Sequence, residues 1–385
     1  MLNFLFWLAA ASLLGNIYVS GTVVRGVRRM THIRDVPRLK GGGIPRVSVV
    51  IPACNEEKTI TPALESVLNL DYPGLEVIVV NDRSTDYTGK VLEGIKKRYP
   101  ELRVFTVTEL PRGWLGKCHA LQYGAERARG EYILFTDADV IMERSTLSRA
   151  MHHVLANRLD HLCMFFSNMA SGGLLNTLLM EIAGGLLLFF KPWKAGDPES
   201  RHFMGVGAFN LVKSSAYRAI GGHRSIALQP IDDIMLGRAI KESGYAQDCL
   251  LGTGFVRVAW YSRVGDLVRG LMKNIFAACD YRTGRVLAGI ALILFLNVLP
   301  FWGALLSTGS VSLLFLIAVL VRLGSFAGGL PASGLSPWYA PWALVTPYIQ
   351  IYIIIRATVI TLRNKGITWR GTYYPLADLK DKNRR

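Results

Sequence analysis

The sequence predicts an α/β domain with a mostly parallel sheet, flanked by apolar helices long enough to cross a membrane. Four apolar runs of strand length, VSVVIPAC, LEVIVVND, LRVFTV and EYILFTD, alternate with segments of helical pattern. Strands that are apolar almost throughout are typical of a parallel sheet covered by helices on both faces. The chain has 385 residues, 51% of them hydrophobic, which leaves room for one such domain and several spans.

The amino-terminal segment, residues 1–24, is expected to be a transmembrane anchor of about spanning length. A cleaved signal peptide carries its charges before the apolar run, whereas here three arginines follow it (Arg25, Arg28 and Arg29). This order predicts a retained anchor with the next domain in the cytoplasm. Residues 25–46, basic and containing three consecutive glycines, are expected to form a linker.

The α/β domain is expected to cover residues 47–285, with its first helices at residues 61–70, 87–98 and 117–129. Pro62 falls in a first helical turn and Gly130 follows the last helix, as helix start and stop signals do.

An apolar stretch, GGLLNTLLMEIAGGLLLFFKPW, occupies residues 172–193 inside this domain and carries Glu181. We expect an interfacial helix, because a true span would place the acidic clusters before and after it on opposite sides of the membrane. A span or a core helix of the domain remains an alternative.

Residues 286–362 are expected to form a carboxyl-terminal transmembrane region with three candidate spans, followed by a basic tail at 363–385. Three spans after a cytoplasmic domain would place the tail outside, yet its basic residues favour the inside. One of the three segments is therefore expected to be re-entrant or interfacial. The sequence as a whole indicates an integral protein of a bacterial-type inner membrane.

The formal charge of +16 indicates an anionic membrane surface as a partner and not nucleic acid. The basic residues flank apolar stretches instead of forming one interleaved patch. The five cysteines include no CxxC pair, which favours a reducing compartment and argues against a zinc site or a disulfide framework.

Three acidic clusters carry the candidate chemistry: Asp82, Asp137 with Asp139, and Asp232 with Asp233. The first two follow predicted strands, so their carboxylates should meet at the ligand-binding edge of the sheet. Hard oxygen ligands there suit Mg²⁺ or Mn²⁺ bound to a diphosphate, and an acid of the third cluster could be a general base. Each cluster also has an ordinary structural interpretation: an Asx turn at Asp82, a helix cap near Ser145 for Asp139, and a helix amino terminus for the pair.

Six motifs in order, VSVVIPACNEE, VIVVNDRSTD, PRGWLGKCHAL, FTDADV, GVGAFNLVKSSAYRAIGG and IDDIMLGRAIKESGY, resemble family 2 glycosyltransferases of the GT-A fold. The resemblance covers roughly residues 45–280. It is closest to the membrane-bound branch that glycosylates lipids and includes ceramide, carotenoid and hopanoid-associated enzymes. It implies an inverting transfer of one sugar from a nucleotide sugar, here a UDP-sugar, to the hydroxyl of a membrane lipid.

The resemblance also implies roles for single residues. In the donor site it places Pro52, Asn55, Glu57, Asp82, Lys117 and Asp137, and on the metal Asp137 and Asp139. Asp233, beside Asp232, matches the catalytic base. On the acceptor side it places Gly205, Gly207 and Ala208.

The chain departs from the family pattern in lacking the QxxRW motif of processive synthases. Arg269 and Lys273 are candidate replacements for its positive charge near the phosphates, or basic side chains that reach from a membrane helix to the interface. The gap favours a single transfer over the alternative of a processive polysaccharide synthase. A non-catalytic transporter subunit with a nucleotide-sensing domain stays open as a second class. A nucleotidyltransferase is disfavoured because the loop after the first strand, ACNEEK, is acidic and lacks glycine.

Overall fold

The computed structural model describes residues 2–381, which divide into two compact units. The α/β unit comprises residues 30–169 and 191–260. The helical unit comprises residues 2–29, 170–190 and 261–381.

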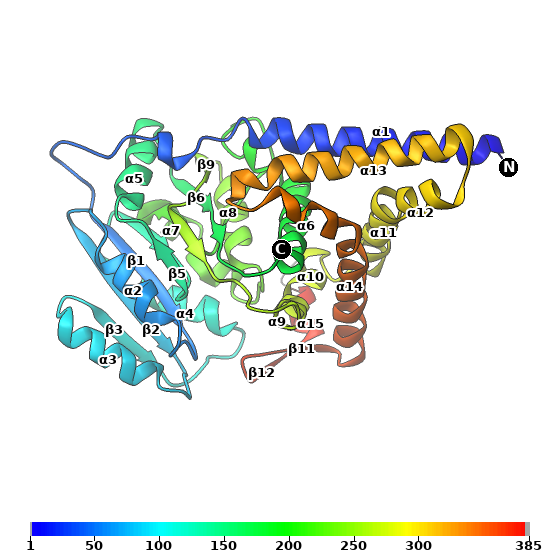
Figure 1. Ribbon diagram of the computed structural model, residues 1–385. Helices are drawn as coiled ribbons and strands as arrows, with labels where there is room; N and C mark the ends of the chain where they lie inside the picture. Colours follow the sequence, from blue (N-terminus) through cyan, green and yellow to red (C-terminus); the bar gives the residue numbers. More distant parts are fainter. Residues whose placement is uncertain (1, 382–385) are drawn as a thin grey trace. The chain divides into compact units, whose positions relative to one another are not determined.

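The large sheet of the α/β unit has its strands in the order β3-β2-β1-β4-β8-β6-β9. Figure 1 labels β3, β2 and β1 of this sheet, and β6 and β9. Neighbouring strands are parallel except around β8, which runs antiparallel to β4 and to β6. The strands are β1 (Val47–Ala53), β2 (Leu75–Asp82), β3 (Arg103–Val107), β4 (Tyr132–Phe135), β6 (His161–Phe165), β8 (Asn210–Lys213) and β9 (Gln247–Leu251). A smaller sheet joins β5 (Val140–Met142), β10 (Val256–Val258) and β7 (Ser167–Asn168). The predicted mostly parallel sheet is confirmed.

Successive strand residues point to opposite sides of the sheet. Because successive residues of β1 are buried and apolar on both sides, helices cover both faces of the large sheet. Val50 of β1 packs into a core with α4 (Gly116–Ala125), α7 (Ser214–Ala219) and α8 (Asp232–Glu242). Its neighbour Ile51 faces α2 (Ile60–Leu68) instead. The remaining helices of the unit are α3 (Thr88–Arg98) and α5 (Thr146–Ala156).

The helix expected at 117–129 ends earlier, at Ala125. The backbone N–H of Arg129 donates to Glu76 Oε2 at 2.9 Å, and that of Gly130 donates to Ser48 Oγ at 2.8 Å. Because side chains of β1 and β2 take these donors, the last residues leave the helix and lead directly into β4.

The helical unit contains the apolar segments of the sequence. Among the described residues, four helices have the length and hydropathy to cross a membrane: Asn3–Val27, Gly173–Lys194, Thr283–Leu306 and Gly309–Gly329. The corresponding elements are α1 (Leu2–Val27), α6 (Gly173–Phe190), α11 (Thr283–Ile293) continuing through a π-helical segment (Leu294–Val298) into α12 (Leu299–Leu306), and α13 (Gly309–Gly329). Helices α1 and α13 pack side by side (Figure 1). Residues 1 and 382–385 of the predicted anchor and tail lie outside the described residues.

Pro300 explains the π-helical segment. A proline has no backbone N–H, so the carbonyl of Leu296, four residues earlier, loses its helical donor. Asn16 of α1 supplies the missing bond, with its Nδ2 3.0 Å from Leu296 O, and Ser12 donates to Phe295 O at 3.0 Å. Polar side chains of one apolar helix thus satisfy the broken backbone of another, as hydrocarbon surroundings require.

The last of the three candidate spans is broken, which is compatible with the expectation that one of the three is re-entrant. A short 3-10 helix (Pro337–Leu344) and α14 (Thr346–Arg363) meet at an angle of 57°. Pro347 lies in the first turn of α14 and cannot continue a helix from the residues before it. After α14 the chain forms a hairpin of β11 (Gly366–Trp369) and β12 (Thr372–Pro375), then α15 (Leu376–Asp381). Short helices α9 (Val264–Gly270) and α10 (Asn274–Ala278) precede α11.

Candidate functional site

The carboxyl ends of β1, β2 and β4 meet at one edge of the large sheet, because these strands are parallel neighbours. Asp82 is the last residue of β2, and Asp137 and Asp139 follow β4. Since β8 is antiparallel to β4, the segment before it, residues 205–208, reaches the same edge. Ligands bind at this edge in open α/β folds.

Lys117, in the first turn of α4, lies between two of the acidic clusters. Its Nζ is 2.7 Å from Asp137 Oδ1 and 3.4 Å from Asp232 Oδ2. Burial alone would favour the neutral amine, but the charges of Asp137, Asp232 and Asp233 outweigh it and raise the pKa of Lys117 well above its ordinary value. The site therefore keeps a fixed positive charge among its carboxylates.

Asp233 is held with its carboxylate at the sheet edge. Its Oδ2 accepts a hydrogen bond of 2.7 Å from the N–H of Gly207, and its Oδ1 accepts one of 2.9 Å from the N–H of Ile234. Desolvation, and then the charge of Asp232, raises the pKa of Asp233 to about 6. Asp232 is buried with 7% of its side chain exposed, whereas Asp233 is partly exposed. Both also lie in the first turn of α8, where negative charge stabilises a helix amino terminus. This structural role is compatible with a catalytic role for the same residues.

The segment before β8 has room only for glycine at two positions, because the first turn of α8 lies directly against it. A Cβ on Gly205 would lie 1.8 Å from the backbone oxygen of Asp233. A Cβ on Gly207 would lie 2.8 Å from Asp137 Oδ2 and 3.4 Å from Asp233 Oδ2. Thr136 Oγ1 donates to Ala208 O at 2.8 Å and fixes this segment beside β4. The close approach places a backbone N–H, instead of a side chain, between two acidic groups.

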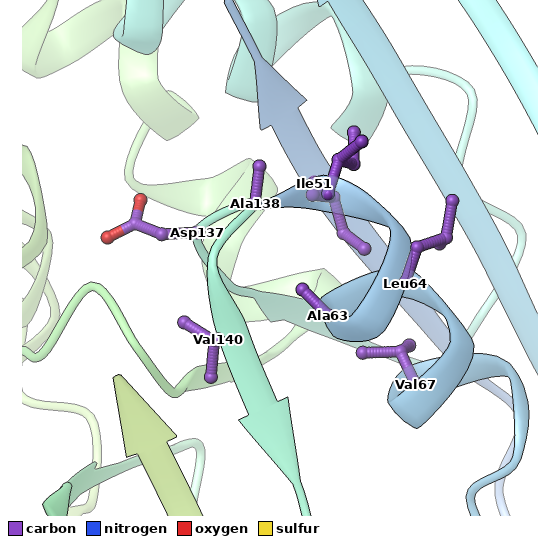
Figure 2. A pocket seen from close by; sticks show the side chains of 8 residues that line it. Ile51, Ala63, Leu64, Val67, Asp137, Ala138 and Val140 are labelled. Atoms are coloured by element: carbon purple, nitrogen blue, oxygen red, sulfur yellow. The ribbon is translucent and has the colours of Figure 1, made fainter. Parts of the chain in front are cut away.

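Asp137 and Asp139 form the part of the site that suits a cation. Burial, followed by the charges of Asp137 and Glu56, raises the pKa of Asp139 to about 7. Figure 2 shows the Asp137 carboxylate directed away from the apolar side chains of α2 that line the gap behind it. Across residues 2–381, no three His, Cys, Asp or Glu side chains gather as a metal site made of protein alone would require. Two hard carboxylates under mutual repulsion nevertheless fit Mg²⁺ or Mn²⁺ when phosphates complete the coordination.

The structure excludes one interpretation of Asp139, that it caps the helix near Ser145. Ser145 is the N-cap residue of that helix, and among the described residues no side chain caps the helix. The carboxylate next to it is Glu143, whose Oε2 accepts from the Ser145 N–H at 2.7 Å. Strand β5 separates Asp139 from that helix. The capping interpretation of Asp139 is therefore wrong.

Asp82 forms a two-point ion pair with Arg83, with Arg83 Nε 2.8 Å from Oδ1 and Nη2 3.0 Å from Oδ2. Gly116 lies so close that a Cβ there would be 2.5 Å from Asp82 Oδ2. The Asx-turn interpretation applies to Asp86 instead, whose Oδ1 accepts from the Thr88 N–H at 2.9 Å.

Two of the residues predicted after β1 bind the neighbouring loop after β2. Asn55 Oδ1 accepts from the N–H of Thr85 at 2.8 Å, and Glu57 Oε2 accepts from the N–H of Tyr87 at 2.9 Å. Asn55 adopts a positive φ of 58°, which turns the chain at the strand end. Pro52 pairs in register with Val80 inside the sheet. These residues shape the loops of the site, and their contact with a donor stays a prediction.

Arg269 and Lys273 belong to the helical unit and have partners there. Arg269 Nη2 is 2.6 Å from Asp266 Oδ1, and Lys273 Nζ lies 4.0 Å from the ring centre of Trp369. Their proposed phosphate contacts stay a prediction.

Sequence reasoning missed three contributors to this edge: Arg83, Glu56 and Gly116. Each is next in sequence to a residue that was predicted. That position beside a predicted site residue was the only feature of the sequence that could have identified them. Arg83 pairs with the residue just before it and has a positive φ of 53°, which no sequence pattern indicated.

Comparison with known proteins shows what this part of the chain is similar to. Residues 48–217 match the model for glycosyl transferase family 2. The matched region contains Asp82, Lys117, Asp137, Asp139 and the glycine segment before β8, while Asp232 and Asp233 follow it.

Two curated relatives are similar over different lengths. A probable glycosyltransferase of Bacillus subtilis, YdaM, is 38% identical over 119 residues, which are 30% of this chain and 28% of that protein. A 4,4'-diaponeurosporenoate glycosyltransferase of Staphylococcus aureus is 27% identical over 279 residues, 68% of this chain and 69% of that protein.

Among solved structures, the fold is similar to that of a mannosyltransferase from Pyrobaculum calidifontis in complex with GDP-Man and Mn²⁺. The TM-score is 0.58 at 20% identity, and the alignment covers 94% of this chain and 99% of the other. The likeness shows a shared GT-A fold.

Proposed function

Since the chain carries a family 2 glycosyltransferase domain, we propose that it is an inverting enzyme that moves one sugar from a nucleotide sugar to a membrane lipid. The observation that carries the proposal is the Asp233 carboxylate, held by the Gly207 N–H at the sheet edge that also carries Lys117, Asp137 and Asp139. A base, a fixed cation and a metal-type carboxylate pair are the groups that such a transfer needs.

The proposed acceptor is a lipid of carotenoid type. Its support is twofold: the chain has four helices of membrane-spanning length and hydropathy among its described residues, and the Staphylococcus aureus relative is named for a carotenoid substrate. We place the protein in a bacterial inner membrane with the α/β unit in the cytoplasm, where nucleotide sugars are made. The predicted boundaries at residues 24, 46, 285 and 362, and the interfacial position of residues 172–193, are parts of the same proposal.

In the proposed mechanism, Asp233 accepts the proton from the acceptor hydroxyl as its oxygen attacks the anomeric carbon. The nucleoside diphosphate leaves from the opposite face, so the configuration at that carbon inverts. Lys117 provides positive charge toward the diphosphate. Asp232, buried against Lys117, keeps the ammonium in place at 3.4 Å.

Asp137 and Asp139 would hold the divalent cation together with the donor phosphates. When bound, such an ion neutralises negative charge on the leaving diphosphate. The proposed ion is Mg²⁺ or Mn²⁺, and the Pyrobaculum relative was solved with Mn²⁺. We propose a UDP-sugar as donor. GDP-sugars are the alternative, because that relative was solved with GDP-Man.

The test uses the purified full-length protein in lipid nanodiscs with UDP- or GDP-sugars, Mg²⁺ or Mn²⁺, and a carotenoid acceptor. We expect free nucleoside diphosphate and an equal amount of a glycolipid that is heavier by one sugar. Mass spectrometry and nucleotide chromatography measure both products. A ladder of sugars would indicate the processive alternative, pyrophosphate would indicate a nucleotidyltransferase, and nucleotide binding without any turnover would indicate the transporter subunit.

A further inference from the structure

An ion pair lies among the apolar helices of the helical unit. Glu181 of α6 accepts through Oε1 from Arg322 Nη2 of α13. Only 10% of the Glu181 side chain and 13% of the Arg322 side chain are exposed. Charged side chains among apolar helices are energetically costly, so their presence usually marks a specific role.

Two further donors complete the contacts of Glu181. Thr346 and Gln350, both on α14, donate to Oε2, the latter at 3.1 Å. The carboxylate of α6 is thereby joined to α13 and α14 together. Because its oxygens are occupied by protein donors, the pair is suited to holding helices and not to conducting a substrate.

The amino-terminal half of α6 is packed just as closely. Thr177 is fully buried, and its Oγ1 donates to the carbonyl of Tyr339 at 3.1 Å. A Cβ on Gly173 would lie 2.7 Å from the Trp342 ring. Helix α6 therefore has one defined register within the helical unit.

The chain leaves α6 at Phe190 and continues into the α/β unit as the segment that leads to the acceptor-side glycines. This segment is fastened to α8 and β9. Lys241 of α8 donates to Ala195 O at 2.8 Å and to Asp197 O at 2.7 Å. The Met204 N–H donates to Gln247 Oε1 at 2.9 Å, and three residues later Gly207 binds Asp233.

We propose that Glu181, Arg322, Thr346 and Gln350 form a clamp that fixes the register of α6 and so positions the acceptor-side segment that is covalently attached to it. The four are positioning residues, since they act through α6. The catalytic consequence rests on the function proposed above, whereas the clamp itself does not.

The kinetic test compares Glu181→Gln, Arg322→Met and the apolar double variant Glu181→Leu with Arg322→Met. We expect each to lower kcat/KM for the lipid acceptor by about 10- to 100-fold, the cost of a shift near 1 Å. Donor hydrolysis to water should stay within about twofold, because the donor residues lie outside the segment after α6. Arg356→Met is the matched control, since Arg356 is an arginine of α14 whose described contact is Met272 Sδ, and it should behave as wild type.

The double variant separates positioning from simple folding. Replacing both partners of a buried ion pair by apolar residues commonly restores stability. We expect it to restore thermal stability and not acceptor kcat/KM. Recovery of both, or an equal loss of transfer and donor hydrolysis in the single variants, would overturn the proposal.

A second readout needs no activity. With Thr177→Cys as a reporter, maleimide labelling at position 177 should be slow, and it should become at least about tenfold faster when Arg322→Met loosens α6. An unchanged labelling rate would overturn the clamp. If the wild type neither binds nor hydrolyses a nucleotide sugar, the proposed function fails, and the labelling rates still decide on the clamp.

Discussion

Replacing Asp233 with asparagine is expected to lower sugar transfer by about 10²- to 10⁴-fold, the usual contribution of a general base. Asparagine keeps the shape, and its one carbonyl oxygen can still accept the Gly207 N–H bond, while the bond from the Ile234 N–H is lost. Because neither bond involves the donor residues, the affinity for the nucleotide sugar should stay within about twofold of wild type. Single-turnover kinetics and calorimetric donor titration measure the two effects separately. Asp232→Asn is the matched control and should reduce transfer less, because its carboxylate is buried against Lys117.

The pH dependence follows from the same residue. The base must be ionised, and the pKa of Asp233 is raised to about 6. Turnover of the wild type should therefore be full above this pH and fall as pH decreases through about 6.

Near-normal turnover in Asp233→Asn, combined with loss of activity in Asp232→Asn, would show that the base is Asp232 and not Asp233.

Replacing Asp139 with asparagine is expected to abolish the metal-dependent part of donor binding. Residues that only hydrogen-bond to a metal ligand already contribute about 10- to 100-fold to metal affinity. Loss of a ligand itself should therefore lower metal affinity by at least that factor. Nucleotide affinity measured in EDTA should not change. The control is Asp71→Asn, an acid whose carboxylate pairs with Arg38 and is 59% exposed. Metal-dependent binding that survives in Asp139→Asn would contradict the assigned ligands.

The same variant carries a stability prediction. The folded pKa of Asp139, about 7, exceeds its ordinary 3.8, so the folded state binds this proton more tightly than the unfolded state does. Ionised Asp139 thus costs stability increasingly as pH rises from about 4 to about 7. Without metal, Asp139→Asn should melt at the same temperature as wild type or higher at pH 8. A clear loss of stability there would mean that the carboxylate has a structural partner.

The parallel core of the fold and its acidic edge could be predicted because both depend on local pattern. Apolar runs of strand length ended in Asp82 and in the Asp137 cluster, and parallel neighbours must bring their ends together. The antiparallel β8 could not be predicted from its own sequence, since antiparallel pairing depends on where the chain returns after α6. That return is what brings Gly207 to Asp233.

The helical unit was less predictable for a related reason. Hydropathy locates apolar segments but not their breaks or their partners. The 57° bend before α14 depends on Pro347 together with the packing around it. The Glu181 contacts join residues 141 to 169 positions apart in the chain, so Glu181 and Arg322 looked like isolated charges in the sequence.

The most direct test of the central claim is the anomeric configuration of the product. The glycolipid from a short reaction with one α-linked nucleotide sugar is isolated, and its anomeric proton coupling is read by NMR. Direct attack by an acceptor hydroxyl that loses its proton to Asp233 predicts a single β-linked sugar. An α-linked product would require a second displacement on the enzyme and would contradict the mechanism.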